Sequence, residues 1–255
     1  MLYDALPVQE IVDRASAHEF LKEATRLATS EELRDVGDRL ARKGRRFQAA
    51  LAPEALPALD EAALGELLRH VFYLRRRTRG LVRTHGMDAL REGIAALLWG
   101  DKPPGERLER FLAQLPELKQ AHGLSLASEL LHYAAPERHW LWTHWMWDPK
   151  TGAGALSLVL EKGADLNGGS LAETYAKVGG AVTVVAQRGR AEGFTSFAPE
   201  PFGTTVYLAS VYAVYMYTVS KMRLSKEFAQ MLPELPEFAR RLLGVQQLEP
   251  GTLHV

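Results

Sequence analysis

The chain has 255 residues, enough for one large domain or two small ones whose core needs no disulfide or metal to hold it together. Basic and acidic residues number 31 each, so the net charge is zero, which argues against nucleic-acid binding by bulk charge alone but allows a local basic face. The absence of cysteine excludes disulfides, thiol catalysis and metal sites built from thiolates.

Apolar residues recur at helical spacing along most of the chain, and glycine, proline and capping residues separate the periodic stretches. We predict helices at about residues 8–28, 30–51, 60–74, 87–99, 105–115, 124–134, 171–185, 204–222 and 237–243. Thr29 with Glu32, and Ser170 with Glu173, have the spacing of a capping box, which favours a helix beginning at each pair. On the stretch 105–115, the charged side chains expected to face water are Glu106, Arg107, Glu109 and Arg110. The predicted fold class is mainly α, a multi-helix globular protein.

Two of these stretches leave alternatives open. Gly179 and Gly180 weaken the helix predicted around them, so residues 181–185 could form a strand instead. Residues 204–222 are apolar but contain four tyrosines, which favours a buried helix over a membrane-spanning one. Residues 1–7 lack the basic and apolar regions of a signal peptide, so we expect a cytoplasmic protein with no membrane contact.

Residues 139–148 contain four of the five tryptophans and two of the eight histidines. Indole rings gain free energy when they are buried, so this stretch either plugs the core between helical layers or lines a pocket. A pocket would be lined by His139, Trp140, Trp142, His144 and Trp145. Residues 149–154 then break the pattern, and we expect them to separate a helical domain at 1–150 from a C-terminal helical part at 151–255 that packs on it.

The densest run of positive charge follows the third predicted helix. Its members are Arg75, Arg76, Arg77, Arg79 and Arg83. In a chain without net charge, such a local excess favours a patch that contacts phosphates. The alternative is a solvated helix end whose arginines pair with Glu66, Asp88 and Glu92.

Leu115-Pro116 opens a hairpin-like segment at 115–127, in which Gly123-Leu124-Ser125-Leu126-Ala127 stands where a helix would begin, and Trp142-Thr143-His144-Trp145 follows after a turn. This order resembles that of the helix-hairpin-helix DNA glycosylases, such as endonuclease III. In that family Leu-Pro opens a glycine-containing hairpin, a helix beginning Gly-x-Lys-Thr-Ala follows, and a short Asp-Thr-His-Val-like segment carries the catalytic Asp. The resemblance covers about residues 60–150 and implies the glycosylase fold with an additional helical C-terminal part.

The resemblance also implies that backbone N–H groups of the hairpin and a helix N-terminus bind a DNA phosphate, here around Gly123 and Ser125. The chain departs from the family because Trp142 stands at the position of the catalytic Asp and Ser125 at that of the Lys nucleophile, and because its hairpin is longer with one glycine. A glycosylase needs a carboxylate to stabilise positive charge at the sugar, or an amine to attack it. We therefore expect binding without the usual chemistry.

Three other residues are candidates for catalysis, namely Asp148, Glu129 and His132. Asp148 could serve as a shifted carboxylate, although its place before Pro149 favours a turn-capping role. Glu129 and His132 could perform acid–base chemistry if they are buried together, or Glu129 could be a half-exposed helix residue. The histidines do not have the spacing of a known metal motif, so we predict no metal and no cofactor.

These observations predict a helical protein that binds DNA or another polyanion and is related to DNA glycosylases, but lacks their usual catalytic residues. One alternative is a structural or regulatory protein whose aromatic surfaces dock a protein partner or a second copy of the chain. The other is an enzyme with an aromatic pocket for a small ligand.

Overall fold

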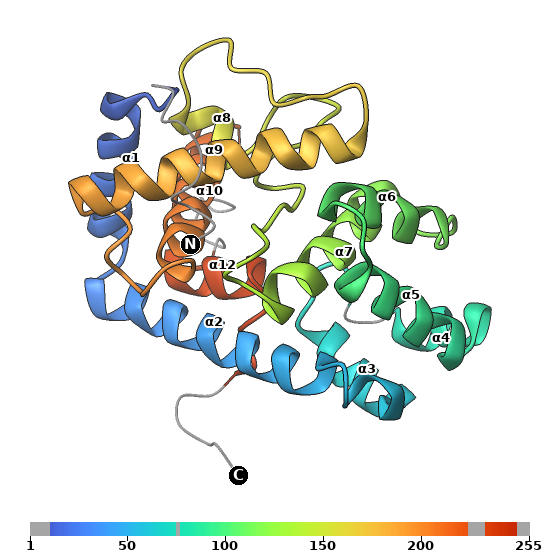
Figure 1. Cartoon of the computed structure of the whole chain (residues 1–255). Helices are drawn as coiled ribbons and strands as arrows, with labels where there is room; N and C mark the ends of the chain where they lie inside the picture. The colour runs from blue at the N-terminus through green and yellow to red at the C-terminus, as the bar shows by residue number, and fades with distance from the viewer. Residues whose placement is uncertain (1–10, 75–76, 224–232, 249–255) are drawn as a thin grey trace.

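The computed structural model describes residues 11–74, 77–223 and 233–248 (Figure 1). Its α-helices are α1 (Arg14–Leu27), α2 (Ser30–Leu51), α3 (Glu61–Arg69), α4 (Thr78–His85), α5 (Met87–Trp99), α6 (Pro104–Ala113), α7 (Gln120–Ala134), α8 (Ala155–Val159), α9 (Leu171–Glu192), α10 (Phe202–Arg223) and α12 (Leu235–Leu242), with a short 3-10 helix, η2 (Leu56–Ala58). The described residues form no strand, only isolated β-bridges such as the one between Val12 and Leu160. The prediction of a mainly α fold is confirmed.

The helices form two groups that meet at α7 (Figure 1). α10 is the centre of one group and packs against α1, α2, α8, α9 and α12. In the other group α5 and α6 pack against each other and against α7, and α3 packs against α4. Because α7 also packs on α2, and α9 on α6, the helices after residue 150 pack directly on those before it, around one hydrophobic core.

Both predicted capping signals begin a helix. At α2, the Thr29 backbone N–H donates to Glu32 Oε2 (2.8 Å) and the Glu32 N–H donates to Thr29 Oγ1 (3.2 Å), which closes the capping box. At α9, Ser170 Oγ accepts from the Glu173 N–H (3.1 Å), and the Glu173 carboxylate accepts from the N–H of the preceding Gly169 (2.7 Å). These bonds satisfy backbone donors that the first turn of a helix leaves free.

The first helix begins later than predicted. Asp13 caps α1 by accepting from the Ser16 N–H (3.1 Å), and residues 11–13 pair with the end of α8 and the residues after it. The Asp13 N–H donates to the Val159 carbonyl (3.0 Å), and the Glu161 N–H donates to the Ile11 carbonyl (2.8 Å). This extended pairing is incompatible with helical backbone at residues 11–13. The predicted residues 8–10 lie outside the described ranges.

The third predicted helix, at 60–74, ends early at Arg69, and α4 was not predicted at all. Asp60 caps α3 as expected, by accepting from the Ala63 N–H (2.8 Å). At the other end, the His70 carbonyl accepts from Lys43 Nζ (2.8 Å) and His70 Nδ1 donates to the Gly244 carbonyl (3.0 Å). His70 is therefore held by two distant parts of the chain, and residues after it form turns rather than helix.

The strand considered at 181–185 does not form, because α9 is one continuous helix. A Cβ atom on Gly179 would lie 1.7 Å from Cε2 of Trp140, so only glycine lets this indole pack directly on the helix backbone. The two glycines in this helix are therefore compatible with it, and Gly179 serves the contact between α9 and residues 139–148.

α10 is buried over most of its described length, as predicted for residues 204–222, although Tyr215 is exposed. Its polar groups bond inside the protein: Tyr207 Oη donates to the Ala17 carbonyl (3.0 Å), and Ser210 Oγ donates to the Val206 carbonyl (2.9 Å). Within the described ranges, no helix has the length and hydropathy that crossing a bilayer requires.

Candidate functional site

Three of the four tryptophans in residues 139–148 belong to the core. The exposed fractions of Trp142, Trp145 and Trp147 are 0%, 3% and 2%. Trp142 Nε1 donates to the Trp147 carbonyl (2.9 Å), and Trp147 Nε1 donates to Asn167 Oδ1 (3.1 Å), so both of these buried indole N–H groups are satisfied. The alternative in which Trp142 and Trp145 line an open pocket does not agree with this burial.

Of the remaining pocket candidates, Trp140 and His144 lie closer to the surface than His139. Trp140 is half-buried against α9, where its Nε1 donates to the Tyr175 carbonyl (3.1 Å) and its own carbonyl accepts from Tyr175 Oη (3.2 Å). His139 is buried. Burial, and then the positive charges of Arg107 and Arg138, lower the pKa of His139 to about 4. His144 is partly exposed, with Nε2 3.3 Å from Asp148 Oδ2.

The candidate catalytic residues are occupied by the fold. Glu129 is buried rather than half-exposed, and Oε2 accepts from Lys43 Nζ at 2.5 Å. His132 is also buried and donates from Nδ1 to the His139 carbonyl (2.8 Å), and burial lowers its pKa to about 4. Asp148 caps a turn, accepting from the Lys150 N–H (2.9 Å) and Thr151 Oγ1 (2.9 Å). The described part of the chain contains no group of three or more potential metal ligands.

Three of the five predicted phosphate-contacting arginines lie within the described ranges, and all three are exposed: Arg77, Arg79 and Arg83. Arg75 and Arg76 lie outside those ranges. Within the described ranges, none of the three carboxylates considered as their partners, Glu66, Asp88 and Glu92, forms an ion pair with these arginines. Glu66 pairs with Arg69, and Asp88 pairs with Arg91 (2.6 Å). Among the described residues, no ion pair neutralises these three arginines.

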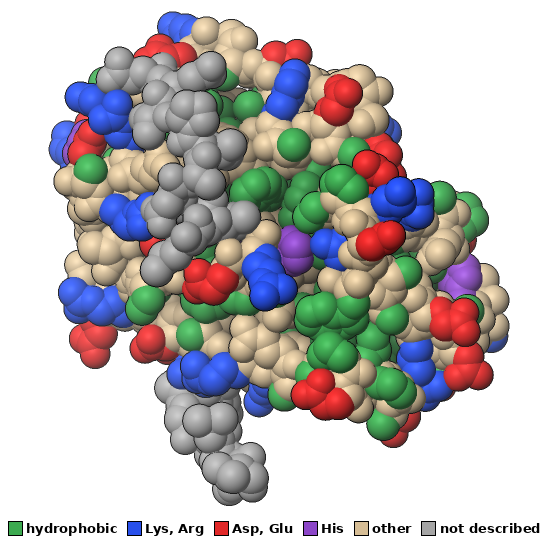
Figure 2. Space-filling model, in the orientation of Figure 1, with side chains coloured by type: hydrophobic (Ala, Val, Ile, Leu, Met, Phe, Trp, Pro, Cys, Tyr) green, Lys and Arg blue, Asp and Glu red, His purple; other side chains and the backbone are tan. Residues whose placement is uncertain are grey.

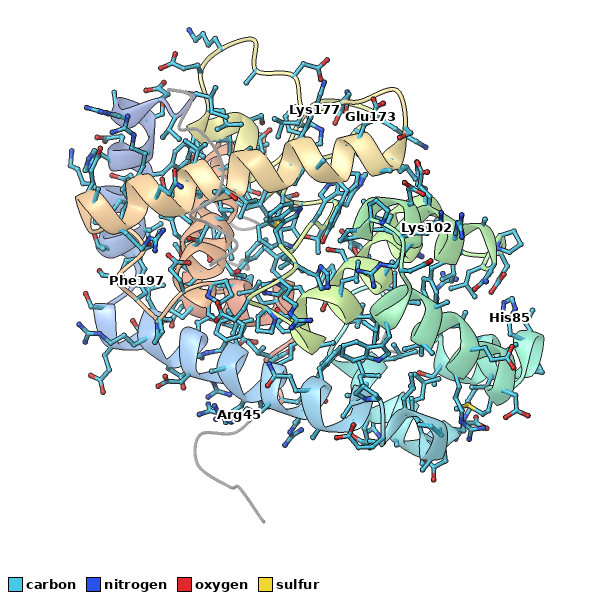
Figure 3. The ribbon with its side chains drawn as sticks, in the orientation of Figure 1. Arg45, His85, Lys102, Glu173, Lys177 and Phe197 are labelled. Carbon is cyan, nitrogen blue, oxygen red and sulfur yellow. The ribbon has the colours of Figure 1, made fainter. Side chains whose placement is uncertain are left out.

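Residues 114–119 connect α6 to α7 and lie beside α4. His85, in the last turn of α4, is 2.7 Å from Glu117 of this connection, from Nε2 to Oε1. Figure 3 labels His85 at the end of α4. The contact holds the α6–α7 hairpin next to the helix that carries Arg79 and Arg83.

The N-terminus of α7 adds a second positive element. No side chain caps this helix end, and Lys119 is the residue that precedes its first turn. His122 lies in that turn with its ring stacked on Tyr73, the ring centroids being 5.2 Å apart. Burial, and then the charges of Arg77, Lys119 and His144, lower the pKa of His122 below its usual value. Charges from three separate segments therefore act on one imidazole.

We use the name α4–α7 basic surface for five residues: Arg77, Arg79, Arg83, Lys119 and His122. Arg77, Lys119 and His122 lie near the positive dipole end of α7, whereas Arg79 and Arg83 lie on the exposed face of α4. A helix N-terminus next to cationic side chains is a common arrangement for binding phosphate. The sequence indicated the arginines but not Lys119 or His122. Leu115-Pro116 could have located Lys119 and His122, because a shorter hairpin beginning there would place both residues at the start of the next helix.

The hairpin anchor predicted at Gly123 and Ser125 is wrongly placed, because α7 begins at Gln120 rather than at Gly123. Both residues lie inside the helix and are buried. A Cβ atom on Gly123 would lie 2.6 Å from Leu112 Cδ2, so this glycine permits close packing of α6 on α7 rather than a turn.

Three hollows lie in the described part of the second group of helices. One, of about 520 Å³, is lined by Pro53, Leu56, Pro57, Asp88, Arg91, Glu92, Ala95 and Trp99. Trp99, the tryptophan outside residues 139–148, is 43% exposed there. Figure 2 shows a hydrophobic area on this face between the end of α2 and α5. The other two, of about 120 and 450 Å³, adjoin along α5 and α6, since both are lined by Gly93, Ala96, Phe111 and Gln114.

Comparison of the chain with protein-family models, with curated proteins and with solved structures gives no match. The resemblance to the helix-hairpin-helix glycosylases accordingly stays a prediction that rests on residues 115–148.

Proposed function

We propose that the chain binds DNA or another polyanion through the α4–α7 basic surface, without glycosylase chemistry. The observation that carries this proposal is that Arg77, Arg79 and Arg83 are exposed and have no carboxylate partner within the described part of a chain of zero net charge. Charged side chains on an exposed helix usually find opposite charges nearby in a neutral protein, so an unpaired group favours an external anion.

The shape of the surface supports a backbone contact rather than base reading. α4 places Arg79 and Arg83 four residues apart on one face, so both side chains can reach the same strand of phosphates. The N-terminus of α7, held beside α4 by the contact between His85 and Glu117, offers backbone N–H groups to another phosphate. Contacts of this kind position nucleic acid without specifying its sequence.

We propose no glycosylase chemistry, because the residues at the family's catalytic positions do not support it. Trp142 and Ser125, which stand at the positions of the family's Asp and Lys, are both fully buried. Asp148, the nearest alternative carboxylate, is engaged in its own turn and with His144. We therefore propose binding as the function of this surface and assign it no reaction.

The test is fluorescence anisotropy with a labelled DNA duplex at two or more salt concentrations. Binding should weaken as salt rises, because each neutralised phosphate releases counterions. The double variant Arg79→Glu with Arg83→Glu should weaken binding and lower the slope of log K against log salt by about one for each lost phosphate contact.

The matched control is Arg34→Glu with Arg45→Glu, which makes the same charge change at exposed positions of α2. It should bind DNA nearly as well as the unaltered chain does. Equal losses in the two double variants would mean that only overall charge matters, and would remove the case for this surface. A salt-dependent affinity that neither double variant alters would also contradict binding at this surface.

A further inference from the structure

Arg107 is a buried guanidinium without a carboxylate partner. It was expected to face water on α6, but it is only 8% exposed and lies across the end of α5. Nη1 donates to the Leu97 (2.5 Å) and Leu98 (2.6 Å) carbonyls, which caps the last turn of that helix. Nε and Nη2 have no hydrogen-bond partner in the described part of the chain, and Nε is enclosed. An unpaired buried charge is costly, so a bound anion would stabilise this arrangement.

The side chain of Arg107 lines the 120 Å³ hollow between α5 and α6, together with Lys102 and Arg110. Figure 3 labels Lys102 between these two helices. Neither Lys102 nor Arg110 forms an ion pair with any described residue, and Asp101 is the one carboxylate among the residues that line this hollow. Gly100 makes room for the arrangement, since a Cβ atom there would lie 3.1 Å from Arg107 Cδ.

Along α5 this hollow adjoins the larger one of 450 Å³. The lining that they share includes Gly93, where a Cβ atom would lie 2.8 Å from Gln114 Oε1 and 3.5 Å from Phe111 Cε2. The larger hollow is also lined by Leu90, Leu115, His85 and Glu92, and the exposed amide of Gln114 borders both hollows. A ligand whose anionic group lies at Arg107 therefore has space for an organic part with both apolar and hydrogen-bonding groups.

We propose that this groove between α5 and α6 binds a small phosphate ester, with its phosphate between Lys102, Arg107 and Arg110 and its organic part over Gly93. A phosphate fits three cations that line one hollow better than a carboxylate does, because it carries more negative charge and three acceptor oxygens. The site shares no residue with the α4–α7 basic surface, so binding at each can be tested separately.

The test is isothermal titration of the full chain with three probes: inorganic phosphate, acetate and adenosine monophosphate. Inorganic phosphate should bind saturably, acetate at least about tenfold more weakly, and adenosine monophosphate more tightly than either. The double variant Lys102→Gln with Arg110→Gln should weaken phosphate binding by about tenfold or more. Arg34→Gln with Arg45→Gln is the matched control and should not change it.

Gly93→Ala tests the organic part. Alanine is a better helix former than glycine, and the contact nearest to its Cβ is the end of a flexible glutamine side chain, so α5 should fold. This variant should lose affinity for adenosine monophosphate and keep affinity for inorganic phosphate. Equal affinity of the unaltered chain for these two probes would overturn the ester assignment.

Two results would overturn the site itself: phosphate binding that the Lys102 and Arg110 double variant leaves unchanged, or phosphate binding lost in the variant Arg79→Glu with Arg83→Glu. If the latter pair loses DNA binding but keeps phosphate binding, the two sites are independent. If DNA does not bind at all and phosphate still does, the groove stands without the proposed function.

Discussion

Lys43 Nζ lies 2.5 Å from Glu129 Oε2 in the interior of the protein, where neither side chain has appreciable contact with water. The ammonium group also donates to the carbonyls of His70 (2.8 Å) and Leu243 (2.9 Å) and lies 4.2 Å from the ring centroid of Tyr133. One lysine thus joins α2, α7, the end of α3 and the end of α12. Its three donors are all used, which is the condition under which a buried ammonium is tolerated.

Lys43→Met should destabilise the protein by about 3–5 kcal/mol, because it leaves the buried Glu129 carboxylate without its counter-charge. Lys43→Met combined with Glu129→Met should recover part of this loss. Urea unfolding followed by circular dichroism measures both. Arg45→Met, the same change at an exposed site, should cost less than about 0.5 kcal/mol. A Lys43 variant as stable as this control would contradict the role assigned to the buried pair.

Stability should fall as the pH is lowered from about 6.5 to about 4, in part because of His132. Burial lowers the pKa of this histidine to about 4, so the unfolded chain takes up a proton in this range while the folded chain does not. Protonation of the unfolded state favours unfolding, and the effect levels off below the folded-state pKa. It amounts to at most about 3 kcal/mol.

Urea unfolding at pH 7 and pH 4.5 checks this, with His132→Gln as the comparison. The variant should be less stable than the unaltered chain at pH 7, since it loses the packing of the buried imidazole ring. Between the two pH values, however, it should lose less stability than the unaltered chain does. The same pH dependence in both proteins would show that His132 does not contribute to it.

Gly179→Ala should destabilise the protein by about 1–3 kcal/mol through overpacking, although alanine favours helices. The added methyl group would overlap the ring of Trp140, whose Nε1 donates to the Tyr175 carbonyl and whose backbone carbonyl accepts from Tyr175 Oη. Thermal unfolding measures the change. Gly80→Ala is the control, because nothing lies within 4 Å of a Cβ atom at that helical position, and it should stabilise α4 by up to about 1 kcal/mol. A stabilising effect at both positions would contradict the packing argument.

DNA binding should tighten as the pH falls from 7.5 to 5.5, and His122 should contribute to this change. Burial and then Arg77, Lys119 and His144 hold its pKa below the usual value, so it is neutral at pH 7.5. A nearby phosphate would raise that pKa, and protonation adds a positive charge to the α4–α7 basic surface. Anisotropy at both pH values compares the unaltered chain with His122→Gln, which should gain less affinity. An identical gain would exclude His122 from the interface.

The helical fold followed from local signals, because these act within a few residues of each other. Thr29 and Glu32 form the capping box that their spacing predicts, and Asp60 caps α3 as expected. Gly123 was misleading because local signals are silent about distant contacts. Its sequence neighbours indicate a turn, whereas its role in the structure is to allow Leu112 of another helix to pack against it. α4 was missed because Leu81 and Val82 are its apolar residues, among arginines and a glycine, and give little periodicity.

The candidate sites were harder to predict, because they depend on which charges are neutralised in three dimensions. The arginine run is visible in the sequence, but whether Arg79 and Arg83 have partners depends on Asp88 turning toward Arg91. Arg107 belongs to a stretch of alternating charges that is typical of a solvated helix face. Its burial results from the position of the end of α5, which no local pattern encodes.

Trp99 gives this molecule a built-in optical reporter. It is the most exposed of the five indoles, whereas Trp142, Trp145 and Trp147 are enclosed and Trp140 is packed on Gly179. A dissolved quencher such as acrylamide should therefore reduce the emission of Trp99 first. Because its ring lines the 520 Å³ hollow beside α5, a molecule entering that space would shield it and change the emission without any label.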